Sequence, residues 1–213
     1  MHTDDGVPEV EVLTGQLHQL RMDTSQNTEG NRTRIFRFTT GGRHCVFYAA
    51  TFLGSRNAFL AEGDRVELAV QSPVDGKQEE IPVYAIRNLE DGDVYVSHSM
   101  SQWRPDRKGL PRLSLRQQRS LLMQFGAVVV IVWLIFGVAW RAFDADGAVG
   151  RQIFYVASAV LPAAWLTPAV TMCGYRLRWS LGMPTDRQCL QEKVYAALSL
   201  SSPLSVPSRV YDV

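Results

Sequence analysis

The run LLMQFGAVVVIVWLIFGVAW, from Leu121 to Trp140, contains a single markedly polar residue, Gln124. At a rise of about 1.5 Å per residue, a helix of this length covers the roughly 30 Å hydrocarbon core of a bilayer. A buried helix of a soluble protein is the alternative interpretation. The run is apolar on every side, however, and lies between basic residues, which favours a membrane span. We therefore predict a transmembrane helix over about 121–140.

A second uncharged run, IFYVASAVLPAAWLTPAVTMCGY, extends from Ile153 to Tyr175. It contains Pro162 and Pro168, each of which removes one helical hydrogen bond. Membrane helices tolerate such prolines when neighbouring groups satisfy the freed carbonyls. We therefore predict a kinked second span over about 153–175, joined to the first by a short loop, so that 120–176 forms a transmembrane hairpin.

Small side chains recur every fourth residue in the second run, at Ala159, Ala163, Thr167 and Thr171. This spacing is typical of a face that lets two membrane helices approach closely. The first span is the expected partner of this face, and a second copy of the chain is the alternative.

Basic residues concentrate at the outer ends of the two spans. Residues 101–119 carry six Lys or Arg against one acid, whereas residues 1–100 carry nine against fifteen. Because Lys and Arg stay on the cytoplasmic side, we expect a multi-pass protein of the inner (plasma) membrane with both termini cytoplasmic. The residues expected to set this topology and to lie at the membrane surface are Arg104, Arg107, Lys108, Arg112, Arg116, Arg119, Arg176 and Arg178. Residues 1–12 are acidic and lack an apolar core, so the internal helices are expected to direct insertion.

Residues 1–100 are predicted to form a β domain. Residues 34–40 and 43–49 alternate in polarity around Gly41-Gly42, which predicts a hairpin with a two-residue turn. Further strands are expected over about 10–22, with a bend at Gly15, over 64–71, and over the hairpin 81–98. Five or six short strands favour a small closed barrel, and a short helix within 51–63 would suit an OB-like one. Another small barrel, an open sheet or a sandwich are the alternatives.

The fold class predicted for the whole chain is thus an α+β membrane protein, with an N-terminal OB-like barrel followed by a two-helix transmembrane hairpin. The domains are 1–100, a basic juxtamembrane linker over 101–119, the hairpin over 120–176, and a cytoplasmic segment over 177–213. Leu115 onward is expected to be helical already. In the last segment, residues 184–200 predict an amphipathic helix, with Pro184 as first residue, on the membrane surface or against the barrel. The final dozen residues predict a disordered tail.

No catalytic, cofactor-binding or metal-binding motif is found in the sequence, so we do not expect an enzyme. His44 and Cys45 are neighbours in a predicted strand and so point to opposite faces. His98 has no recognisable acid partner. Three arginines (Arg34, Arg37 and Arg43) lie among aromatic residues, but the acidic balance of the domain argues against a nucleic-acid partner.

Three segments carry a family resemblance: Thr14-Gly-Gln-Leu17, Thr33-Arg-Ile-Phe-Arg-Phe38 and Gly63-Asp-Arg-Val-Glu-Leu68. Together with the domain layout, they resemble small bacterial membrane proteins described as type VI secretion system effectors. The resemblance implies an N-terminal β domain with transmembrane helices, and it implies no particular activity or catalytic residue.

The expected function is therefore that of a non-enzymatic inner-membrane protein whose cytoplasmic barrel docks a protein partner, as a type VI immunity, accessory or effector protein. One alternative is an NfeD-like membrane scaffold or protease-associated protein, although such proteins carry the barrel after the helices. An oligomeric pore-forming effector is another alternative, for which the spans offer few polar residues. Expected partners are membrane lipids, an unidentified protein and a second copy of the chain.

Overall fold

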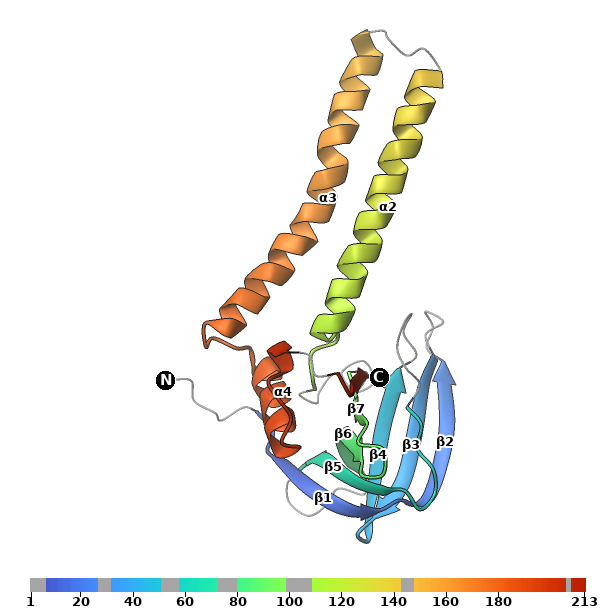
Figure 1. Ribbon diagram of the computed structural model, residues 1–213, viewed down its shortest axis with the longest axis vertical. Coiled ribbons are helices and arrows are strands. Elements are labelled where there is room, and N and C mark those ends of the chain that lie inside the picture. Colours follow the sequence, from blue (N-terminus) through green and yellow to red (C-terminus); the bar gives the residue numbers. More distant parts are fainter. Residues whose placement is uncertain are drawn as a thin grey trace. The chain divides into compact units, whose positions relative to one another are not determined.

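The computed structural model describes residues 7–26, 32–50, 58–72, 80–98, 109–142, 148–205 and 208–213. Within these residues the chain is an α+β protein with a mixed sheet of eight strands and three α-helices (Figure 1). It divides into two compact units. The sheet unit comprises Met1–Leu115 and Pro184–Val213, and the hairpin unit comprises Arg116–Met183. The sheet unit is therefore built from both ends of the sequence.

The sheet unit contains all eight strands. They are β1 (Val10–Gln16), β2 (His18–Gln26), β3 (Arg32–Thr40), β4 (Arg43–Ala50), β5 (Arg65–Gln71), β6 (Ile81–Asn88), β7 (Val94–Val96) and β8 (Val210–Asp212). Their order is β1-β5-β6-β4-β3-β2, with β7 paired to β6 and β8 paired to β7. The β4–β6 and β7–β8 pairs are parallel and the others antiparallel. The expected OB-like closure is not shown, because β1 and β2 stand at the two ends of this order.

Both predicted hairpins are confirmed. Gly41 and Gly42 join β3 to β4 with φ values of +58° and +76°, the left-handed pair that a two-residue turn requires. Gly92, with a φ of +77°, lies in the turn between β6 and β7. Of the helix suggested within 51–63, residues 51–57 lie outside the described residues, and 58–63 are not helical.

The bend in the first strand lies a few residues after the predicted position. The register of β2 against β3 shifts between His18 and Arg21, and Gln19 has a φ of +56°. The carboxylate of Glu62 accepts hydrogen bonds from the backbone N–H groups of Gln19 and Leu20, at 2.8 and 2.7 Å. This carboxylate satisfies the donors that the bulge removes from the ladder. Gly15 instead allows a close approach, since a Cβ there would lie 2.8 Å from Cγ2 of Thr40.

The central strands of the sheet are buried on both faces. On one face, Phe36, Phe47 and Leu68 belong to the larger core. On the other face, Val46 and Tyr84 pack with residues of α4 (Asp186–Ala197) in a second core. A helix that covers one face explains why β6 is an almost continuous buried apolar strand instead of an alternating one.

The C-terminal segment belongs to the sheet unit. This placement corrects the prediction of a disordered tail and decides where the predicted amphipathic helix lies. Leu190, Val194 and Leu198 have no exposed surface, so the predicted amphipathic helix lies against the sheet. Its N-cap is Thr185, which forms a capping box with Gln188, and Pro184 therefore precedes the cap instead of opening the helix. The predicted disordered tail is wrong for 203–205, which form the 3₁₀ turn η1 (Pro203–Ser205), and for 210–212, which form β8. Val210 and Val213 are buried there. The polar residues around them hid this apolar pattern in the sequence.

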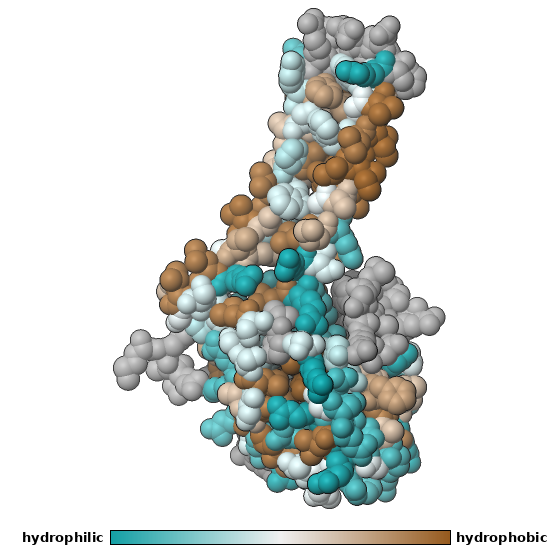
Figure 2. Space-filling model, in the orientation of Figure 1, coloured by the Kyte–Doolittle hydropathy of each residue, from teal (hydrophilic) through white to brown (hydrophobic). Residues whose placement is uncertain are grey.

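The hairpin unit consists of α2 (Leu115–Ala142) and α3 (Ala148–Ser180), and the connection over 143–147 lies outside the described residues. The prediction that α2 begins at Leu115 is confirmed. Both helices extend beyond the predicted spans, to about 42 and 50 Å at 1.5 Å per residue. Figure 2 shows apolar surface along much of the hairpin.

Candidate functional site

Helices α2 and α3 are each long enough and apolar enough to cross a membrane. The most apolar 18-residue stretch of each helix contains no buried residue. The core helix of a soluble protein would bury such a stretch, so the exposed apolar surface favours membrane association. Membrane-facing helices need no polar face, and the hairpin offers none over these stretches.

Two indole groups connect the helices. Nε1 of Trp165 donates a hydrogen bond to the backbone carbonyl of Leu122, at 3.0 Å, and Nε1 of Trp133 donates to Oγ of Ser158, at 3.3 Å. The first contact depends on Gly126, because a Cβ at this position would lie 2.9 Å from Nε1 of Trp165. No sequence pattern assigned a role to Trp165 or Gly126. A Gly one turn after Leu122 was the available signal.

Aromatic rings pack at the loop end of the hairpin. Phe136 stacks on Phe154 with ring centroids 6.1 Å apart and an interplanar angle of 10°, and Trp140 lies 5.6 Å from Phe154. Such pairs add about 0.5–1.5 kcal/mol to the contact. This cluster fixes one end of the hairpin.

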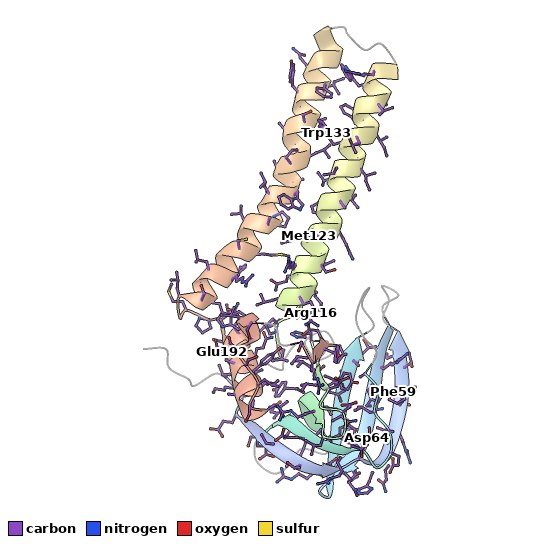
Figure 3. All side chains as sticks on the ribbon, viewed as in Figure 1. Phe59, Asp64, Arg116, Met123, Trp133 and Glu192 are labelled. Carbon is purple, nitrogen blue, oxygen red and sulfur yellow. The ribbon has the colours of Figure 1, made fainter. Side chains whose placement is uncertain are left out.

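A groove of about 790 Å³ lies between the helices. It lies between the aromatic cluster and the N-terminal end of α2. Its walls include Leu122, Gly126 and Trp133 of α2, and Leu161, Pro162 and Trp165 of α3. Figure 3 labels Arg116, Met123 and Trp133 in succession along α2, and the last two of these residues line the groove. Because the two indole N–H groups already have acceptors, the groove offers little but hydrocarbon surface to a ligand.

The contacts that the structure shows between α3 and α2 come from residues outside the predicted small-residue face. Ala159, Ala163, Thr167 and Thr171 are all exposed, and α3 meets α2 through other residues such as Phe154, Leu161 and Trp165. At about 100° per residue, these larger residues lie on roughly the opposite side of the helix. The structure therefore gives no support to the first span as partner of this face, and its packing partner stays a prediction.

The two prolines lie inside α3, which continues through both of them. Figure 1 shows the axis of α3 curving along its length. Pro162 lacks the N–H group that would bond the carbonyl of Ser158, and Pro168 lacks the one for Ala164. The neighbouring threonines bond other carbonyls: Oγ1 of Thr167 donates to Ala163 and Oγ1 of Thr171 donates to Thr167, both at 2.9 Å.

The basic residues predicted to set topology are exposed wherever the structure describes them. Arg116 and Arg119 lie in the first turns of α2, and Arg112 precedes them. Arg176 and Arg178 lie in the last turns of α3. The other three, Arg104, Arg107 and Lys108, lie outside the described residues.

Two of the three arginines that lie among aromatic residues, Arg37 and Arg43, are paired with acids. Arg37 forms ion pairs with Asp23 and Glu80, and Arg43 pairs with Glu11. The neighbouring rings of Phe36, Phe38 and Phe47 belong to the core and expose no face for stacking on bases. The arrangement is that of ordinary outer and inner strand faces.

His44 and Cys45 point to opposite faces, as predicted. Cys45 is buried in the core, whereas His44 is exposed, with Nδ1 3.3 Å from Oγ1 of Thr39. Burial raises the pKa of the Cys45 thiol to about 11, against a smaller lowering by Arg43. A thiol held protonated is a poor nucleophile.

His98 has an acid partner that the sequence did not reveal. Its Nε2 lies 3.1 Å from Oδ1 of Asp212, and Nδ1 lies 2.7 Å from the carbonyl oxygen of Pro111. A carbonyl oxygen only accepts, so Nδ1 is the donor in that bond. Both ring nitrogens are thus engaged, and the buried imidazole joins β7, the segment before α2, and β8. Asp212 is 114 residues away in sequence, which is why local patterns could not find it.

The described part of the chain contains no group of three His, Cys, Asp or Glu residues that could hold a metal ion. No family model, curated protein or solved structure matches the sequence. The class that the fold defines is an α+β protein with a mixed eight-stranded sheet and a pair of helices apolar enough to cross a membrane.

Proposed function

We propose that this chain is a non-enzymatic docking protein of the bacterial inner membrane, anchored by the α2–α3 hairpin. It binds a protein partner through the sheet unit on the cytoplasmic side. Within a type VI secretion setting, it serves as an immunity or accessory protein.

One observation carries the topology. The segments on both sides of the hairpin, Met1–Leu115 and Pro184–Val213, fold into a single compact unit. Strand β8 pairs with β7, and α4 supplies part of the second core. A single folded unit lies on one side of a bilayer, so both flanks of the hairpin share that side. This argument is independent of the basic residues, which then select the cytoplasm: Arg116, Arg119, Arg176 and Arg178 flank the hairpin, against Arg141 and Arg151 at its loop end.

The strand order supports an OB-like barrel for the docking unit. Strands β1 and β2 stand at opposite ends of the order but are separated by one residue, Leu17. Leu17 has no exposed surface, and its N–H donates to the carbonyl of Asp64 at 3.0 Å. One bent stretch of chain thus pairs with β5 at one end and with β3 at the other, which is the way a small Greek-key barrel closes.

Strand β2 is the proposed docking edge. Among the described strands it pairs with β3 alone. Met22 lies opposite the buried Phe36 in the register, yet 58% of its surface is exposed. An apolar side chain on an open strand edge is typical of a site where a partner adds an extended segment as a further strand. In such binding, backbone hydrogen bonds supply affinity and side chains supply selectivity.

The hairpin suits an immunity or accessory role better than it suits pore formation. A pore needs polar groups along the spans. The hydroxyls of Thr167 and Thr171 donate to carbonyls of their own helix, so they do little to line a water path.

Reporter fusions test the topology. Alkaline phosphatase and green fluorescent protein are fused in turn after residue 100, within 144–148 and after residue 213. We expect fluorescence without phosphatase activity at the first and last positions, and the opposite pattern in the loop. Phosphatase activity at residue 100 would contradict a cytoplasmic sheet unit.

In-cell photo-crosslinking tests the docking edge. A photoreactive amino acid replaces Met22, and a matched variant carries it at Phe59, which is 79% exposed outside the strands. Cells express the chain together with its neighbouring genes. We expect a discrete protein adduct from position 22 that is absent from position 59. Equal labelling at both positions would refute the edge, and toxicity of the chain expressed alone would refute the immunity role.

A further inference from the structure

The stripe of α2 that lines the groove continues toward the basic N-terminal end of this helix. Residues 116, 119, 123, 126 and 130 follow one another at intervals of three or four, so they form one stripe along α2. Met123, Gly126 and Val130 line the groove, and Arg116 and Arg119 follow within two turns toward the helix N-terminus. Helical side chains lean toward the N-terminus, and long basic ones extend to the membrane surface from there.

The described residues of the hairpin unit include no carboxylate that could pair with Arg119, and Asp144 and Asp146 near the loop lie outside them. The sequence contains no Asp or Glu between Asp106 and Asp144, nor between Asp146 and Asp186. Arg119 is exposed, and no ion pair of the described residues includes it. The described residues of the hairpin therefore offer no carboxylate to this guanidinium, and an anionic group beside it would come from outside them.

A second hairpin does not meet this requirement. A copy inserted in the same orientation would bring further arginines and no carboxylate to the same level of the membrane. Like charges at close range oppose such a contact. An anionic phospholipid supplies both missing parts, namely hydrocarbon for the groove and a phosphate for the arginine.

We propose that the α2–α3 groove binds an anionic phospholipid, with an acyl chain between the helices and the phosphate at Arg119. The site rests on the hairpin spanning the membrane, as in the proposed function, but not on the docking role of the sheet unit. The Trp133–Ser158 bond and the aromatic cluster join the two helices toward the loop, so the acyl chain would enter from the basic end or from the side.

Quenching by brominated lipid tests this site, because Trp133 and Trp165 line the groove. The full chain is reconstituted in phosphatidylcholine vesicles that contain a small fraction of brominated phosphatidylglycerol or of brominated phosphatidylcholine. We expect the anionic probe to quench at a roughly fivefold lower fraction, the ratio that about 1 kcal/mol per basic residue implies. Equal quenching by the two probes would overturn the proposal.

Two variants locate the headgroup and the tail. Arg119→Gln should remove the preference for the anionic probe, whereas the matched control Arg178→Gln, at the end of α3, should keep it. Ala127→Phe fills the groove and should reduce quenching by both probes. An equal loss in Arg119→Gln and Arg178→Gln would mean general surface attraction and would refute the site. A dimer without bound lipid in native mass spectrometry would assign the groove to a second copy.

These results separate the lipid site from the proposed function. If the chain is extracted from membranes by alkaline carbonate, both proposals fail. If the reporter fusions place the sheet unit outside, the docking role fails, while the quenching result stands on its own.

Discussion

In the sheet unit, Leu68 and Leu190 have no exposed surface, whereas in the hairpin unit Leu134 is 53% exposed and Ile135 is 64% exposed. Burying a leucine from water contributes about 1.5–3 kcal/mol, so the sheet unit is held together mainly by its apolar cores. Lipid solvates apolar side chains as well as a neighbouring helix does. Apolar burial therefore does not drive the two helices of the hairpin together. Its helices depend instead on a few specific contacts, namely two indole hydrogen bonds and one aromatic cluster. Identical side chains thus have different energetic roles in the two units.

The same substitution in both units gives the largest contrast. Leu190→Ala removes a side chain from the core between α4 and the sheet, and we expect a loss of about 3 kcal/mol in unfolding free energy. Leu134→Ala removes an exposed side chain, and we expect a change below about 0.5 kcal/mol. Denaturant unfolding of the detergent-purified chain, followed by circular dichroism, measures both. Comparable losses would show that Leu134 packs against protein.

Removal of a buried ion partner should cost more than removal of an exposed one. Asp212→Ala leaves Nε2 of the buried His98 without its partner, and we expect a loss of about 2 kcal/mol. Asp23→Ala breaks the exposed pair with Arg37 and should cost less than about 0.5 kcal/mol. Hydrogen exchange locates the effect: β7 and β8 should lose protection in Asp212→Ala alone. Unchanged exchange in β8 would show that its strand pairing, and not His98, holds the C-terminal segment.

Two glycines of α2 test the indole contact. Gly126→Ala places a methyl group 2.9 Å from Nε1 of Trp165, and we expect a loss of about 1 kcal/mol with a shift in tryptophan emission. At Gly137 an added Cβ meets no atom within 4 Å, so Gly137→Ala should stabilise the helix by about 0.5–1 kcal/mol. Unfolding in mixed micelles of rising dodecyl sulfate content measures both. A stabilised Gly126→Ala would show that the helices do not approach closely there.

Sequence patterns predicted the elements that local chemistry specifies. The apolar runs indicated α2 and α3, and Gly41-Gly42 indicated the β3–β4 hairpin. What the patterns missed depends on residues distant in sequence. Val210 and Asp212 form β8 only because β7 is available to pair with, and the polar composition around them suggested disorder. Trp165 contacts Leu122 because the two helices lie antiparallel at that level, and no periodicity of either helix encodes the register. The small-residue spacing is present in α3, but larger residues on the opposite side of the helix make the contacts with α2.

The smallest effect concerns Cys45, at the core of the sheet unit. Burial raises the pKa of its thiol from the ordinary 9.0 to about 11 in the folded chain, with Arg43 lowering it by less. The folded state thus favours the protonated thiol, and this contribution to stability is complete below pH 9 and is lost as the pH rises to about 11. In Cys45→Ala the contribution is absent, so the stability of this variant should fall less than that of the wild type between pH 8 and pH 10.5. Cys189→Ala, which removes a thiol on α4, is the control and should retain the wild-type pH dependence. Parallel curves for the wild type and Cys45→Ala would mean that the thiol titrates alike in the folded and unfolded chain, and that water reaches this part of the core. In that case the sheet unit would resemble the exposed hairpin more than its burial indicates.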